Sequence, residues 1–145
     1  MAEPVVIWGA GGVGGTVGAF LARAGHPVLF VDVVVEHVKR VAQHGLAIEG
    51  PIAEFTSPPI PSVMPAAMTG RHKLIILAVK SYHTEDATRA LLPHLADDGA
   101  IVSFQNGLNE LTIAGIAGRE RTIGAFVNFS ADYLEPGRIT YGARS

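Results

Sequence analysis

The chain has 145 residues, the length of one domain that can bury a core of its own. Apolar residues make up 48% and charged residues 17%, a balance that argues against a disordered chain. The formal net charge of −2 gives no electrostatic reason to expect nucleic acid or an anionic membrane as a partner. There is no cysteine, no basic leader and no apolar run of about 20 residues, so we expect a soluble cytoplasmic domain.

The first half of the chain predicts two strand–helix units, each closed by a glycine. The strand, helix and turn signals, in chain order, predict a strand over 5–8, a helix over 13–24, a strand over 28–31, a helix over 36–44, a hairpin over 46–55 and a proline-rich loop over 56–65.

The second half continues the alternation. We expect a strand over 74–79, a helix over 85–95, a strand over 100–104, a helix over 110–117, a strand over 122–127 and a hairpin over 133–141. Crossovers between such strands are right-handed, which predicts an α/β, Rossmann-type doubly wound fold: a mostly parallel sheet with helices on both faces. Phe104, Phe126 and Phe129 are expected in the core.

The segment Gly9-Ala10-Gly11-Gly12-Val13-Gly14 matches the pattern G-x-G-x-x-G between a strand and a helix. Gly9 permits the tight turn, Gly11 leaves room for a pyrophosphate, and Gly14 lets the helix lie close to the sheet. The helix N-terminus then offers free N–H groups and a partial positive charge. This context predicts dinucleotide binding; the alternative is a purely structural turn.

Asp32 ends the second predicted strand, where a carboxylate can accept hydrogen bonds from the adenosine ribose hydroxyls. The same charge repels a 2′-phosphate, and Val33, Val34 and Val35 follow in place of an arginine. These residues favour NAD over NADP. The alternative is that Asp32 only caps the next helix.

Two further strand ends carry polar side chains. Lys80 follows one buried strand, and Gln105-Asn106-Gly107 follows the next. Both ends should open into the crevice beside the glycine turn, where Lys80 supplies a cation and Asn106 a donor with an acceptor. Alternatively, Asn106-Gly107 is a common turn pair and Lys80 a solvated loop residue.

Taken together, the glycine turn, "AVKSYHTEDA" (78–87), "QNGLNE" (105–110) and "PGRITYG" (136–142) resemble the ketopantoate reductase (2-dehydropantoate 2-reductase) family. The resemblance spans essentially the whole chain and corresponds to the N-terminal cofactor domain of that family. It implies NADPH-dependent reduction of 2-ketopantoate to pantoate, a step toward coenzyme A. By position, Lys80 and Asn106 would contact cofactor and substrate, and residues 9–14 would hold the pyrophosphate.

The chain departs from the family in two respects. An arginine common after the second strand matches Val33, with Asp32 just before it, which strengthens the preference for NAD. The family also has a C-terminal helical domain that supplies the catalytic lysine and much of the substrate pocket. We expect that domain to lie outside these 145 residues, so no catalytic residue is assigned within them and the chain is expected to be a fragment.

Other chemistries have weaker support. The six histidines show no metal-ligand spacing, and no serine lies in a G-x-S-x-G elbow, so neither a metal site nor a hydrolase is expected. Alternatives to the reductase are a stand-alone nucleotide-binding or redox-sensing module, a reductase of a related 2-oxo acid, and an S-adenosylmethionine-dependent methyltransferase, against which Gly14 argues. A homodimer is possible on this sequence, which does not specify an oligomeric state.

Overall fold

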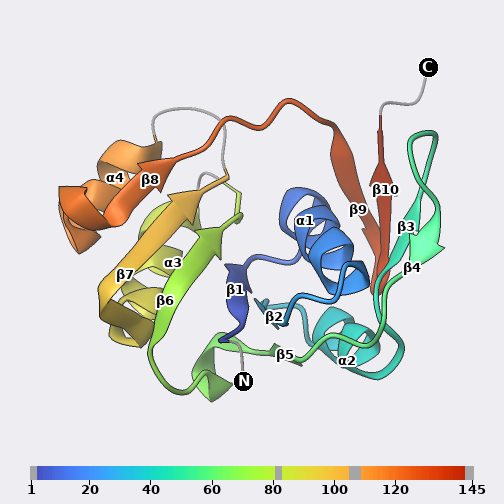
Figure 1. Ribbon diagram of the computed structural model, residues 1–145, viewed down its shortest axis with the longest axis horizontal. Coiled ribbons are helices and arrows are strands. Elements are labelled where there is room, and N and C mark those ends of the chain that lie inside the picture. Colours follow the sequence, from blue (N-terminus) through green and yellow to red (C-terminus); the bar gives the residue numbers. More distant parts are fainter. Residues whose placement is uncertain (1–2, 81–82, 105–108, 143–145) are drawn as a thin grey trace.

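The computed structural model describes residues 3–80, 83–104 and 109–142. Its main sheet has six parallel strands in the order β5-β2-β1-β6-β7-β8 (Figure 1). The strands of this sheet are β1 (Val5–Trp8), β2 (Val28–Val31), β5 (Ser62–Val63), β6 (His72–Leu77), β7 (Leu95–Ser103) and β8 (Thr122–Gly124). The chain passes from β1 to β2 on one side and later returns to β6 on the other, which creates a topological switch point at the end of β1.

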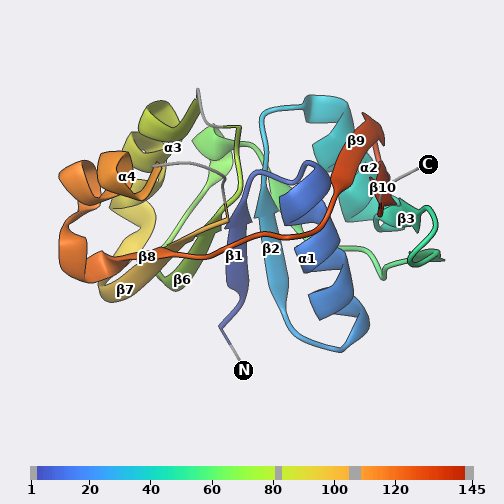
Figure 2. The same ribbon diagram turned by 90° about the horizontal axis from the view of Figure 1, so that it is seen from above.

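Helices cover both faces of this sheet, as the ribbon views show (Figures 1 and 2). The α-helices are α1 (Gly12–Arg23), α2 (Val35–His44), α3 (Thr84–Leu91) and α4 (Asn109–Ala117), and the short 3₁₀ turns are η1 (Pro65–Ala67), η3 (Leu92–His94) and η4 (Arg119–Arg121).

Side-chain alternation along β1 builds a separate core on each face. Val6 and Trp8 pack with buried residues of α3 and α4, while Ile7 packs in a second cluster with residues of α1 and α2. Successive side chains of a strand point to opposite faces, so a strand that is buried on both sides is apolar throughout. The predicted doubly wound α/β fold is confirmed.

A second, four-stranded sheet lies beside α1 and α2 (Figure 1). Its order is β4 (Phe55–Thr56), β3 (Ala47–Glu49), β10 (Arg138–Tyr141) and β9 (Ala131–Glu135). The two hairpins expected from the sequence are both present, as antiparallel pairs β3–β4 and β9–β10. They are joined through parallel pairing of β3 with β10, in which Ile48 lies opposite Ile139.

The structure differs from the sequence-based expectations at several places. Strand β6 begins and ends two residues earlier than the expected strand over 74–79, β7 begins at Leu95, which was expected in a helix, and β8 ends at Gly124 where the sequence predicted a strand to residue 127. Ser62 and Val63, expected in a loop, form β5 and pair with β2 at the edge of the main sheet. Prolines limit the hydrogen bonding of this segment, and an edge strand needs partners on one side only. Phe126, expected in the core, is 89% exposed beyond the end of β8. Among the described residues, no helix has the length and apolarity needed to cross a membrane.

Candidate dinucleotide-binding site

The turn from β1 into α1 is held against the ends of β2 and β6 by backbone contacts. The N–H of Gly9 donates to the carbonyl of Val31 at 2.8 Å, and the N–H of Ala78 donates to that of Trp8 at 2.9 Å. Gly9 has φ of +105°, and a Cβ there would lie 2.8 Å from the carbonyl carbon of Ala78. A Cβ on Gly14 would collide with the carbonyl oxygen of Gly9. These two glycines therefore serve the close approach that the sequence predicts.

The N-terminus of α1 is open to a ligand. Gly11 is its N-cap, and no side chain of the described residues caps the helix or places an acid in its first turn. The first amides of a helix have no intrahelical partner and carry a partial positive charge. A Cβ on Gly11 would meet no atom within 4 Å, whereas one on Gly12 would meet the carbonyl of Ala131. The space over Gly11 is therefore free, and the opposite wall belongs to β9.

Asp32 connects the end of β2 to the glycine turn. Its Oδ1 accepts a hydrogen bond from the N–H of Ala10 at 2.9 Å, and its Oδ2 accepts one from the N–H of Val34 at 3.1 Å. The N-cap of α2 is Val34, without a side-chain cap, so Asp32 is not the N-cap of that helix. Each carboxylate oxygen has a second lone pair, and the side chain can still accept from ligand hydroxyls.

Two cavities adjoin the glycine turn and share Val79 as a wall. The first, which we call the Asp32 cavity, has a volume of about 310 Å³. Its lining residues are Trp8, Gly9, Val31, Asp32, Val33, Pro65, Val79, His83, Asp86, Ala87 and Ala90.

The second, the Lys80 cavity, has a volume of about 350 Å³. Its lining residues are Gly11, Gly12, Val13, Ala78, Val79, Lys80, Phe104, Ala131, Asp132 and Tyr133. The two cavities together place Asp32 at one end of the glycine turn and Lys80 at the other.

The structure brings most of the predicted site residues together. Gly9 and Asp32 line one cavity, and Gly11, Val13 and Lys80 line the other. Lys80 is exposed and lies three residues beyond the end of β6, where the sequence predicted it directly after the strand. Asn106 lies outside the described residues. Phe104, expected in the core, is half-buried and lines the Lys80 cavity.

Tyr133 is a site residue that the sequence analysis did not assign to the crevice. It reaches the Lys80 cavity from β9. Partial burial, followed by the negative charges of Asp32 and Glu135, raises the pKa of its phenol above the ordinary value. The phenol therefore stays protonated near neutral pH and keeps an O–H to donate. Tyr133 lies in a hairpin far along the sequence from the glycine turn, and no motif around it indicated a role at this site.

The residues that the structure describes contain no group of three or more His, Cys, Asp or Glu side chains arranged to hold a metal ion.

Comparison with known proteins identifies the family of the chain. The ketopantoate reductase PanE/ApbA family matches residues 5–144. The 2-dehydropantoate 2-reductase of Pyrococcus horikoshii is 33% identical over 142 residues, which cover 97% of this chain and 44% of that protein. The corresponding protein of a Nostoc species is 29% identical, over 94% of this chain and 45% of its own length. The chain thus spans about half the length of these relatives.

Solved structures agree with this assignment. A PanE/ApbA family ketopantoate reductase from Ralstonia eutropha has a TM-score of 0.82 and 30% identity, over 97% of this chain and 47% of that one. D-mandelate dehydrogenase in complex with NADH has a TM-score of 0.80 and 25% identity, over 97% of this chain and 44% of that one. By its sequence match over residues 5–144 and its doubly wound fold, the chain belongs to the ketopantoate reductase family.

Proposed function

We propose that this chain binds a nicotinamide dinucleotide and forms the cofactor-binding part of a reductase of 2-oxo acids, with 2-dehydropantoate as the candidate substrate. The observation that carries the proposal is the N-terminus of α1, which has no side-chain cap: its N-cap residue Gly11 opens into the Lys80 cavity, and the Asp32 cavity adjoins the same turn at Gly9. Membership of the ketopantoate reductase family and the likeness to a dehydrogenase complexed with NADH support it.

The residues fit the separate parts of such a cofactor. The first amides of α1, from Gly11 to Val13, suit the diphosphate, because they are unpaired donors at the positive end of a helix. The Asp32 cavity suits the adenosine, with the carboxylate accepting from ribose hydroxyls. The Lys80 cavity then takes the nicotinamide end and the substrate.

When bound, the nicotinamide would supply the hydride for reduction of a 2-oxo group. The residues of this chain would bind the cofactor and the substrate and orient them toward each other. The ammonium group of Lys80 can donate hydrogen bonds to a carboxylate or carbonyl oxygen in its cavity, and the protonated phenol of Tyr133 lines the same cavity. The resemblance to the family places the catalytic lysine in a second domain, so we assign no catalytic residue here.

Cofactor choice rests on Asp32 and Val33. The carboxylate of Asp32 would repel a 2′-phosphate in the Asp32 cavity, and Val33, which is 70% exposed, lines that cavity with no positive charge. We therefore propose NAD as the preferred cofactor.

The role of the α1 N-terminus is tested by the substitution Gly11→Ala. The added methyl group meets no protein atom, so we expect an unchanged free energy of unfolding in urea. It would occupy the space above the first amides of α1, so NADH affinity should fall at least about tenfold by calorimetric titration. Gly115→Ala adds a methyl group to open space on α4 and is the matched control. Unchanged NADH affinity in the Gly11 variant would contradict the proposed site.

The preference for NAD is tested by titrating NADH and NADPH separately into the protein and its Val33→Arg variant. NADH should bind the unsubstituted protein more tightly. An arginine at position 33 would face a 2′-phosphate in the Asp32 cavity and should raise NADPH affinity about tenfold. Val35→Arg makes the same charge change at an exposed position outside the described cavity lining and should have little effect. Tighter binding of NADPH by the unsubstituted protein would refute the assignment.

Lys80 distinguishes a reductase from a stand-alone nucleotide-binding module, because only the reductase needs a cation in this cavity. We expect Lys80→Ala to weaken NADH binding about tenfold, the effect of losing a hydrogen bond from a charged donor. Lys73→Ala, at the opposite end of β6, removes only an exposed ion pair with Asp98 and should leave NADH affinity unchanged. Equal affinities for both variants would favour the module.

The chain by itself should turn over ketopantoate negligibly, because the resemblance places the proton donor elsewhere. The measurement is pantoate formed from ketopantoate with NADH, and separately with NADPH, in the purified protein. Steady production of pantoate over many turnovers would show that these residues include the general acid.

A further inference from the structure

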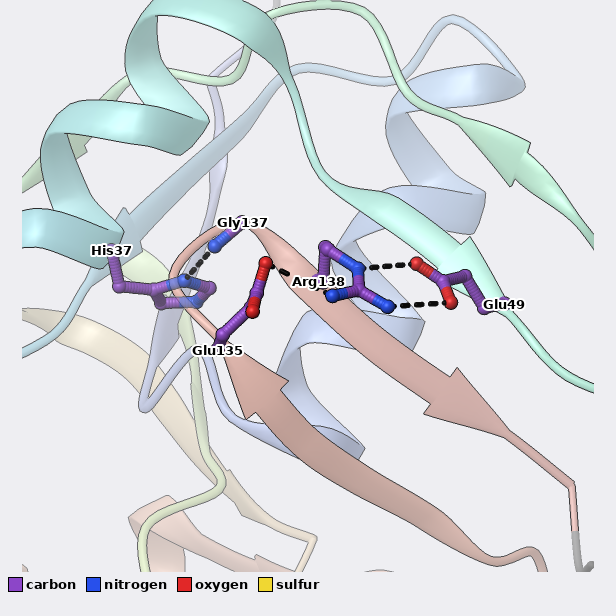
Figure 3. Close-up of polar contacts among 5 residues, drawn as sticks. All are labelled: His37, Glu49, Glu135, Gly137 and Arg138. Carbon is purple, nitrogen blue, oxygen red and sulfur yellow. Dashed lines mark hydrogen bonds and ion pairs between the residues drawn. The ribbon is translucent and has the colours of Figure 1, made fainter.

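A buried histidine on α2 forms a hydrogen bond with the backbone of the glycine turn. His37 is 1% exposed, and each of its ring nitrogens has one backbone partner. The N–H of Gly137 donates to Nδ1 at 2.9 Å, so Nδ1 bears no proton in this arrangement (Figure 3). Nε2 therefore carries the hydrogen of the neutral ring and donates it to the carbonyl oxygen of Ala10 at 2.7 Å.

This second bond bears on the nucleotide site through the geometry of one peptide group. The carbonyl of Ala10 and the N–H of Gly11 belong to the same peptide, and the described chain contains no cis peptide bond. In a trans peptide these two groups point in opposite directions. Because His37 draws the Ala10 carbonyl toward α2, the N–H of Gly11 is turned the other way, and Gly11 lines the Lys80 cavity.

The other polar group of Ala10 is also fixed, because its N–H donates to Asp32 Oδ1 at 2.9 Å. His37 and Asp32 thus hold the two peptide groups that flank Ala10. If either peptide could rotate freely, the N–H groups at the start of α1 would not share one direction. Ordering them would then cost free energy when a diphosphate binds.

The second sheet anchors His37 in turn. Gly137, with φ of +80°, lies in the turn between β9 and β10. The next residue, Arg138, binds Glu49 of β3 through Nε and Nη2 at 2.5 and 2.9 Å, and Glu135 of β9 through Nη1 at 2.9 Å (Figure 3). These hydrogen bonds and charges raise the pKa of Arg138 further above its ordinary value, so its charge persists at any working pH.

The ring of Tyr133 completes this support. It contacts the His37 ring edge-on, with centroids 5.1 Å apart at 88°, and it also lines the Lys80 cavity. One continuous set of contacts thus leads from the second sheet through His37 to the N-terminus of α1.

We propose that His37 is a positioning residue for the cofactor, which orients the Gly11 amide toward the diphosphate by holding the Ala10 carbonyl. This inference rests on the proposed dinucleotide binding at α1. A histidine that only completes the core would contribute to stability without affecting diphosphate binding in particular.

Two substitutions separate the two bonds of the ring. In His37→Gln the amide nitrogen lies as many bonds from Cβ as Nε2 does, so it can still donate to Ala10. In His37→Asn the amide oxygen takes the place of Nδ1 and can accept from Gly137, while Ala10 loses its donor. Each variant gives up one buried hydrogen bond, so both should lose similar stability. His44→Gln, on an exposed position of the same helix, is the control.

The measurements are affinities for ADP-ribose, which contains the diphosphate, and for adenosine, which does not. We expect His37→Asn to weaken ADP-ribose binding about tenfold, while adenosine binding stays unchanged and His37→Gln retains ADP-ribose affinity within about twofold. Unchanged ADP-ribose affinity in the Asn variant would overturn the proposal. So would an equal loss in the Gln and Asn variants.

The unsubstituted protein supplies an independent test that does not depend on the folding of a variant. Long-range ¹H–¹⁵N spectra should show His37 as the Nε2–H tautomer, and ADP-ribose should shift the Gly11 amide signal. An Nδ1–H tautomer would overturn the role of His37 alone. Failure of the unsubstituted protein to bind ADP-ribose, NADH or NADPH would overturn the proposed function and this inference with it.

Discussion

The close approach of α1 to the ends of β1 and β6 is the constraint on which the site depends. At Gly9 and Gly14 the backbone atoms of neighbouring segments occupy the space that a Cβ would need. Glycine alone permits this packing, and the packing brings the N-terminus of α1 to the switch point of the sheet. The amides there are left without protein partners and carry the positive end of the helix dipole. The fold thus presents unpaired donors that suit an anion, without a cationic side chain in the first turn of α1.

Asp32 shows how one carboxylate can serve both the fold and a ligand. Its two oxygens already accept from Ala10 and Val34, and these bonds fix the side chain at the end of β2. A fixed carboxylate loses little conformational entropy when it accepts further hydrogen bonds from ribose hydroxyls. The sequence suggested two alternative roles for Asp32, a helix cap or a partner for ribose hydroxyls. The hydrogen bond to Ala10 adds a third role, because through it Asp32 supports the turn on which the diphosphate would rest.

Local signals predicted five of the six strands of the main sheet, but not all of their ends. The strands β1 and β2 begin and end at the expected residues, because apolar runs bounded by glycine and proline are typical of buried parallel strands. Pairing between distant segments was not predictable in the same way. The sequence indicated both hairpins of the second sheet, but it contained no sign that β3 pairs with β10, nor that Ser62 and Val63 join β2. Such pairings depend on packing among segments far apart in the chain.

The residues of the candidate site also fall into two groups, those that local sequence predicted and those that depend on contacts between distant segments. The glycine turn and Asp32 follow strands directly, and Lys80 lies three residues beyond the end of β6. A parallel sheet brings strand ends together by topology, so the positions of these residues could be predicted. Tyr133 and His37 reach the site through the second sheet and α2. One available signal was that His37 lies one turn before Val41 on the buried face of an amphipathic helix. A polar side chain in that stripe must find hydrogen-bond partners inside the protein, although the sequence does not say which.

The second sheet is therefore part of the proposed nucleotide site and does more than cover α1 and α2. The carbonyl of Ala131 leaves no room for a side chain on Gly12, and Tyr133 forms a wall of the Lys80 cavity, so β9 bounds the space over the α1 amides. Arg138 on β10 binds carboxylates of both neighbouring strands, β3 and β9. Gly137, in the turn between β9 and β10, donates a hydrogen bond to His37. A strand–helix–strand unit made of residues 5–31 alone would contain the glycine pattern but lack both His37 and this wall. The proposed site requires β10 to have paired with β3 and β9, so the proposed nucleotide binding would depend on contacts between segments that lie far apart in the sequence.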